Sequence, residues 1–130
     1  MWTFEIITGK LYDASGAYTA QGYAGGNLGK NPEGKDNPAD ENVPDVGPLP
    51  EGMYTLGSPV EGTHMGIFAI PLIPDPSNNM VGRSGFFCHG DTTPPGNASE
   101  GCVVMPYVTR VRMWQSNDHR LSVVAKVQAG

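Results

Sequence analysis

The sequence has few charged residues, few basic residues and few cysteines. Asp, Glu, Lys and Arg make up 16% of the chain, with eight basic against thirteen acidic residues. A nucleic-acid-binding surface needs clustered Lys and Arg, whereas these are scattered, so we expect no nucleic-acid partner. Two cysteines are too few for a disulfide framework, and they lack the spacing of a structural zinc site. We expect no cofactor and no metal.

Long hydrophobic runs are also missing. No apolar segment approaches the roughly 18 residues that a membrane-spanning helix needs, so no membrane span is expected. The opening residues, MWTFEIITGK, have no basic segment followed by an apolar stretch and therefore do not resemble a signal peptide. The sequence predicts synthesis in the cytoplasm, with any action outside it dependent on non-classical export or lysis.

Glycine and proline, by contrast, are abundant, at 18 and 12 of the 130 residues. Their irregular spacing excludes a collagen-like chain, and so many helix breakers leave little room for long helices. A chain of this length suits one domain, here residues 1–130. We therefore expect a mainly β fold of short strands joined by turns.

Apolar and polar residues alternate over several short segments, which is typical of half-buried strands. Pro71 indicates that its strand is an edge strand or carries a bulge. The predicted strands are 2–7, 10–13 and 18–24, which form a β-meander, followed by 53–56, 67–73, 86–89, 102–105 and 121–127.

One short helix is predicted to begin at Pro106, because proline is tolerated in the first turn, and to end at 117–118. Its apolar residues at three- and four-residue spacing are Val108, Val111 and Trp114 or Gln115, and these should form the buried face.

The segment 25–47 interrupts the strand pattern. It holds three prolines and five acidic residues and shows no apolar periodicity. A structureless segment this long is uncommon in a compact domain. Two interpretations are open: a solvated loop, or a lid or rim over a functional site.

Two polar turns that follow apolar strands carry a thiol and an imidazole, the minimum for a nucleophile and its base. Adjacent strand residues point to opposite faces, so Cys88 should face the core if His89 faces a site. We therefore expect Cys102 to be the nucleophile and His89 its base. A free thiol is only about 3% ionised at pH 7, and a nearby imidazolium can lower its pKa.

Gly101 precedes the thiol and lets the backbone approach a substrate closely. The N–H groups around Gly101 and Cys102 are candidate donors to a developing oxyanion. The same residues also admit other readings: a Cys88–Cys102 disulfide, a metal site formed with His89, or no chemical role.

Other polar residues have structural as well as functional interpretations. His64 and His119 lie in polar turns and are expected to be solvated. Arg83 suits a substrate carboxylate, or an ion pair with Asp91 or Asp75. Asp91 also suits the capping of its own turn.

Several motifs occur in one order along the chain: Tyr23-Ala24-Gly25, the segment GPLPEGMY at 47–54, the segment GRSGFFCHGD at 82–91, and Ser99-Glu100-Gly101-Cys102. Together they resemble the small L,D-transpeptidase-like proteins found as type VI secretion effectors and in phage-related loci. The likeness covers nearly the whole chain. It implies a compact β-sandwich or barrel around a Cys–His site, with one short helix after the catalytic cysteine.

The resemblance implies that the substrate is the tetrapeptide stem of peptidoglycan. The Cys102 thiolate would attack the carbonyl of the third, diamino acid residue, D-Ala would leave, and an acyl-enzyme would form. Water then gives a tripeptide, a free D-amino acid gives exchange, and another stem's amine gives a crosslink. In this family His89 corresponds to the base, and the backbone of Gly90 to the group that orients it.

The resemblance also implies that Ser99 and Gly101 shape the oxyanion turn, and it makes substrate-binding candidates of four residues: Tyr23, Arg83, Ser84 and Asp91. Glu100 is a departure, because larger transpeptidases usually carry His before the Gly-Cys pair. A cognate immunity protein or a secretion component is an implied partner, and the cell wall the place of action. The alternatives are a non-catalytic cell-wall-binding module and a structural part of a phage or secretion apparatus.

Overall fold

The computed structural model describes residues 1–61, 66–92 and 95–127 and confirms a mainly β fold. One sheet contains nine strands in the order β3-β2-β1-β9-β5-β6-β7-β8-β4. Its strands are β1 (Trp2–Glu5), β2 (Lys10–Tyr12), β3 (Tyr18–Gln21), β4 (Tyr23–Ala24), β5 (Gly52–Leu56), β6 (Ile70–Pro74), β7 (Phe87–His89), β8 (Val103–Val104) and β9 (Arg120–Val124).

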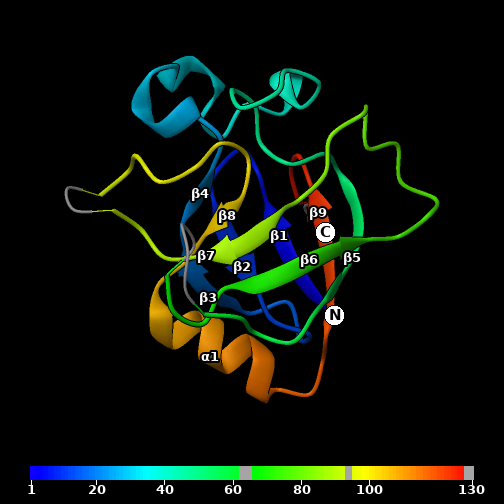
Figure 1. Cartoon of the computed structure of the whole chain (residues 1–130). Coiled ribbons are helices and arrows are strands. Elements are labelled where there is room, and N and C mark those ends of the chain that lie inside the picture. Colours follow the sequence, from blue (N-terminus) through cyan, green and yellow to red (C-terminus); the bar gives the residue numbers. More distant parts are fainter. Residues whose placement is uncertain (62–65, 93–94, 128–130) are drawn as a thin grey trace.

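The sheet curls until it is nearly closed, as in a barrel (Figure 1). The two outermost strands of the order, β3 and β4, are separated in the chain by Gly22 alone. The predicted strand 18–24 is therefore wrong, because it is two strands. A Cβ on Gly22 would lie 1.7 Å from the carbonyl oxygen of Val104, so only glycine permits this close approach.

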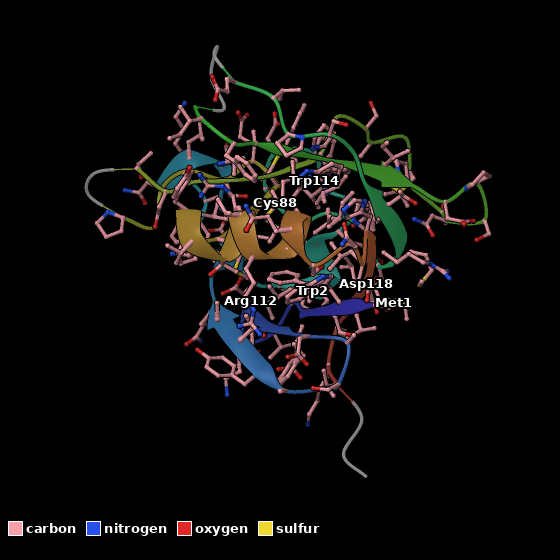
Figure 2. All side chains as sticks on the ribbon, turned by 90° about the horizontal axis from the view of Figure 1, so that it is seen from below. Met1, Trp2, Cys88, Arg112, Trp114 and Asp118 are labelled. Carbon is pink, nitrogen blue, oxygen red and sulfur yellow. The ribbon has the colours of Figure 1, made fainter. Side chains whose placement is uncertain are left out.

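Two strand pairs are parallel, β1 with β9 and β7 with β8, and the other neighbours are antiparallel. The first parallel pair brings the start and the end of the chain together. Figure 2 shows Met1 beside Asp118, and the amino group of Met1 donates a hydrogen bond to that carboxylate. The second parallel pair positions the candidate site.

The strand with Pro71 is not an edge strand, since β6 lies between β5 and β7. The pairing with β5 covers only Leu72–Pro74, so β5 has already ended beside Pro71. The carbonyl of Pro71 accepts a hydrogen bond from Gly57 on that side. The missing N–H of proline therefore costs no ladder bond.

The single helix of the described residues, α1 (Tyr107–Gln115), follows β8 as predicted. Its buried face differs from the prediction: Val108 is 73% exposed, whereas Thr109, Arg110 and Met113 are buried. The helix lies across one end of the barrel (Figure 1), and its inner face meets backbone carbonyls as well as apolar side chains. No helix in the described ranges combines the length and the hydropathy that crossing a bilayer requires.

The segment 25–47 lies at the end of the barrel opposite α1 (Figure 1). It forms three short 3-10 turns, η1 (Asn27–Gly29), η2 (Pro32–Gly34) and η3 (Pro38–Asp40). The segment is tied to the barrel, because Asp36 accepts a hydrogen bond from the N–H of Ala24 at 3.0 Å and donates its own N–H to the Ala24 carbonyl at 2.8 Å. A solvated loop would lack these ties, so the rim interpretation fits better.

Burial of Asp36 raises the pKa of its carboxyl to about 6, against the opposing influence of the Ala24 N–H and of Lys35. The folded chain therefore binds this proton more tightly than the unfolded chain, in which the pKa is about 3.9. The stabilisation is complete below that lower value and is lost as the pH rises through about 6.

We expect Asp36→Asn to remove this part of the pH dependence, because Asn keeps the acceptor for Ala24 and carries no charge. In urea unfolding the variant should be more stable than the parent at about pH 7.5 and equal to it at about pH 4. If the free energy of unfolding changed with pH in the same way for both proteins, the raised pKa assigned to Asp36 would be contradicted.

Candidate active site

A cavity of about 710 Å³ opens between the ends of β7 and β8 and the segment 25–47. His89 and Cys102 both line it, so the structure brings the predicted base and the predicted nucleophile to one cavity. Leu28 and Asp45 line it from the segment 25–47, and Arg110 lines it from α1.

The parallel pairing of β7 with β8 sets this arrangement. Its register places Cys88 beside Val103 and His89 beside Val104, so Cys102 enters β8 next to Phe87. The N–H of Phe87 donates a hydrogen bond to the sulfur of Cys102 at 3.3 Å.

Strand alternation separates the two cysteines as predicted. His89 faces the cavity, whereas Cys88 is fully buried in the core and lies near α1 (Figure 2). Both are free thiols, so the alternative of a Cys88–Cys102 disulfide is wrong. In the described ranges, no group of three or more His, Cys, Asp or Glu side chains is placed to hold a metal ion.

The imidazole of His89 is oriented by the residue that follows it. Its Nδ1 lies 2.8 Å from the carbonyl oxygen of Gly90, which can only accept, so Nδ1 carries the hydrogen. The other nitrogen, Nε2, is then the unprotonated one and can take a proton. Burial lowers the pKa of His89, the Gly90 carbonyl opposes this, and the charge of Arg110 reinforces it. The ring is therefore mostly neutral at pH 7.

The thiol of Cys102 is 8% exposed, and burial raises its pKa above the ordinary value. The N–H of Phe87 and the guanidinium of Arg83 favour the thiolate, while the carboxylate of Glu100 disfavours it. The expected lowering of this pKa is wrong for the free protein. Its resting state is a neutral thiol with a neutral imidazole, and the proton must move during the attack.

Ser99 organises the turn that carries the nucleophile. Its hydroxyl donates to the carbonyl of Cys102 at 2.7 Å and accepts from the N–H of Gly101 at 2.9 Å and of Gly25 at 2.8 Å. The N–H of Gly101 is therefore engaged in the turn, which contradicts its expected role as an oxyanion donor. Of the two expected donors, this leaves the N–H of Cys102, which favours the thiolate of its own side chain.

Gly101 has a conformation that side chains rarely adopt, with a φ of +133°. A Cβ there would lie 2.5 Å from Nη2 of Arg83 and 2.8 Å from the ring of Phe86. Glycine is thus required by space as well as by backbone geometry.

Arg83 is only 9% exposed, and both of its Nη groups are bound to backbone carbonyls. Nη1 donates to Glu41 and Pro48, both at 2.7 Å, and Nη2 donates to Gly47 at 3.1 Å and Glu100 at 3.2 Å. All four Nη hydrogens are used, so Arg83 cannot bind a substrate carboxylate through its two Nη groups. It also makes no ion pair with Asp91 or Asp75. It joins the rim to the turn of the nucleophile.

The remaining predicted residues lie around the cavity mouth. Ser84 is exposed and lines the cavity, as does Asp91. One carboxylate oxygen of Asp91 accepts from the hydroxyl of Tyr23 at 2.5 Å and from the N–H groups of Thr92 and Gly96, so it caps its turn. Tyr23 is buried behind that turn and is absent from the described cavity lining.

Sequence reasoning missed Arg110, which is not among the residues expected on the buried face of α1. It is buried and lines the cavity. No periodicity signalled this, because two of the three carbonyls that it binds, those of Ile67 and Phe68, belong to a distant loop. His119 is not a solvated turn residue: its ring stacks on Trp114 at 3.9 Å. His64 lies outside the described residues.

Comparison with known proteins identifies one matching family. A family model described as the Tlde1 domain matches residues 20–129, which include every predicted site residue. No curated protein matches the chain.

The four carbonyl contacts of Arg83 predict a large effect of Arg83→Met on folding. Four buried or half-buried acceptors would lose their donor, and we expect the free energy of unfolding to fall by about 3 kcal/mol. Urea unfolding measures it. The exposed Arg112, which pairs with Asp13, provides the control: Arg112→Met should change stability by less than about 0.5 kcal/mol. Equal effects of the two substitutions would contradict the proposed linking role.

The two thiols should differ in reactivity towards iodoacetamide. Cys88 is fully buried and its pKa is raised to about 12, so we expect labelling at Cys102 alone in the folded protein. Because the pKa of Cys102 is raised as well, its labelling rate should climb steeply above about pH 8.5. Peptide mass spectrometry locates the label. Rapid labelling already at about pH 6.5 would show that the thiol pKa is lowered instead.

Proposed function

The chain belongs to the Tlde1 domain family, a family of type VI secretion effectors, and we propose that it is a cysteine enzyme that cleaves the L,D bond of peptidoglycan tetrapeptide stems. One observation carries the proposal: Cys102 and His89 share a cavity in which the Phe87 N–H faces the sulfur and the Gly90 carbonyl orients the imidazole. The resemblance in the sequence motifs points to the same chemistry.

The reaction begins with a proton transfer. Nε2 of His89 takes the thiol proton of Cys102 while the sulfur attacks the carbonyl carbon of the third stem residue. The resulting tetrahedral oxyanion is stabilised by a backbone N–H, for which that of Cys102 is the candidate. The C–N bond to D-Ala then breaks, and His89 returns the proton to the leaving amine. The product is a thioester on Cys102.

The thioester is resolved by a second nucleophile that enters the same cavity. Water gives the tripeptide, a free D-amino acid gives exchange, and an amine of another stem gives a crosslink. His89, neutral again after the amine has left, removes a proton from whichever nucleophile attacks. Mass spectrometry of the muropeptides formed with and without an added D-amino acid distinguishes the three outcomes.

The family also bears on partners and place of action. We propose that the protein reaches the cell wall through a secretion apparatus or by lysis, and that a cognate immunity protein protects the producing cell. This proposal rests on the effector family and on the extracytoplasmic position of peptidoglycan.

Substitution of the two reacting groups tests the proposal. We expect Cys102→Ala and His89→Ala each to lower the rate of D-Ala release from tetrapeptide muropeptides by at least about 1,000-fold. The matched control is Cys88→Ala, which should keep most of the activity at a cost of about 1 kcal/mol in stability. Release of D-Ala by Cys102→Ala at the parent's rate would refute the proposed function.

The pH profile is a further readout of the same experiment. Burial lowers the pKa of His89, so its base form persists below about pH 6.5. The rate should therefore fall only as the pH drops below that value, and this acid limb should be missing from any residual activity of His89→Ala. Binding to purified cell wall with unchanged muropeptides would favour the non-catalytic binding module instead.

A further inference from the structure

Arg110 is a buried cation on the wall of the cavity that holds His89 and Cys102. It is only 4% exposed. Its Nε donates to the carbonyl of Phe68 at 3.1 Å, Nη1 to that of Met105 at 2.6 Å, and Nη2 to that of Ile67 at 3.1 Å. A guanidinium has five N–H groups. One hydrogen on each Nη therefore meets no acceptor among the residues described.

Among the described residues, no carboxylate forms an ion pair with Arg110. The ion pairs of the described ranges join Met1 to Asp118 and Arg112 to Asp13. Burial lowers the pKa of the Arg110 guanidinium, and the nearby Cys88 and Tyr107 only partly oppose this. Arg110 also faces the imidazole of His89, whose pKa it lowers. A buried charge without a counterion is costly, so an anion supplied by a ligand would be bound strongly.

The open edge of the guanidinium faces Gly90. A Cβ on Gly90 would lie 3.2 Å from Nη1 and 3.4 Å from Nη2 of Arg110, so the absence of a side chain keeps that edge uncovered. The carbonyl of the same Gly90 holds the imidazole of His89. The uncovered edge therefore lies on the imidazole side of the cavity.

We propose that the Nη1–Nη2 edge of Arg110 binds the free carboxylate of the amino acid that leaves. This inference rests on the proposed function and names its substrate more narrowly. His89 returns its proton to the leaving nitrogen, so the leaving residue lies beside the imidazole, and its carboxylate carbon is two bonds from that nitrogen. The cavity is also lined by Asp45, Asp91 and Glu100, whose carboxylates repel an anion, so the guanidinium of Arg110 is its favoured partner there.

It follows that the enzyme is selective for stems that end at the residue being removed. A tetrapeptide presents the carboxylate of D-Ala to Arg110. A stem extended or amidated at that carboxyl group leaves the guanidinium without its partner. Arg110 is thus a substrate-binding residue, in contrast to Arg83, whose four Nη hydrogens are all engaged in the fold.

The first arm of the test compares two substrates with the full-length protein. One is a tetrapeptide stem ending in D-Ala, and the other is the same stem ending in D-alaninamide. We expect the parent to prefer the carboxylate by at least about tenfold in kcat/KM, in line with a charge-assisted hydrogen-bonded pair. Arg110→Gln should abolish this preference, and Arg112→Gln, an exposed position on the same helix, should keep it.

A second variant covers the case in which Arg110→Gln does not fold. Gly90→Ala retains the guanidinium but forces it to give way by a few tenths of an ångström, so the preference for the carboxylate should shrink. If the parent cleaves both substrates equally well, the assignment of Arg110 is overturned while the proposed function stands.

The second arm needs no turnover and separates the two proposals. D-alanine should slow the labelling of Cys102 by iodoacetamide more than D-alaninamide does, and the difference should vanish in Arg110→Gln or, if that protein is unfolded, shrink in Gly90→Ala. If the parent cleaves neither substrate and D-alanine still protects selectively, the proposed reaction fails and the anion site remains. Equal protection by the two compounds overturns the anion site.

Discussion

The site depends on the parallel pairing of β7 and β8. Because β7 and β8 are parallel, the end of β7 and the start of β8 lie at opposite ends of the pair, and a short hairpin turn cannot join them. The segment between them must cross over, and its Ser99-Glu100-Gly101 turn delivers Cys102 beside Phe87. A shift of one residue in this register would turn His89 towards the core and Cys88 towards the cavity, because strand side chains alternate.

Two arginines compensate for the scarcity of regular structure around the cavity. Segments rich in glycine and proline leave backbone carbonyls without ladder partners, and buried carbonyls require donors. Arg83 satisfies four such carbonyls from the segment 41–48 and from Glu100, and Arg110 satisfies three from Ile67, Phe68 and Met105. Both side chains thus satisfy backbone carbonyls, but Arg110 keeps one hydrogen on each Nη without an acceptor among the described residues. The hydrogens that Arg110 does not use in the fold are what distinguishes a ligand-binding arginine from a structural one.

Alternation along short segments was a sound guide to the fold, because it records which side chains the core receives. It placed Cys88 inside and His89 towards a cavity, and it located the strands to within a few residues. It could not show that Gly22 divides two strands, since that depends on Val104 approaching from 82 residues away. The face of α1 was misjudged for a related reason: carbonyls of a distant loop outweigh the apolar spacing of Val108.

The charge state of the thiol is the clearest case of tertiary structure overriding residue chemistry. A histidine close to a cysteine favours an ion pair only if an imidazolium stabilises the thiolate. Here burial disfavours the charged form of each, raising the pKa of Cys102 and lowering that of His89, and Glu100 adds to the first effect. A neutral pair is consistent with a mechanism in which the sulfur loses its proton only as it attacks the substrate. The negative charge then moves to the oxyanion, which a backbone N–H stabilises. Glu100, Asp45 and Asp91 line the same cavity, and their negative charges leave the guanidinium of Arg110 as the favoured position for an anion.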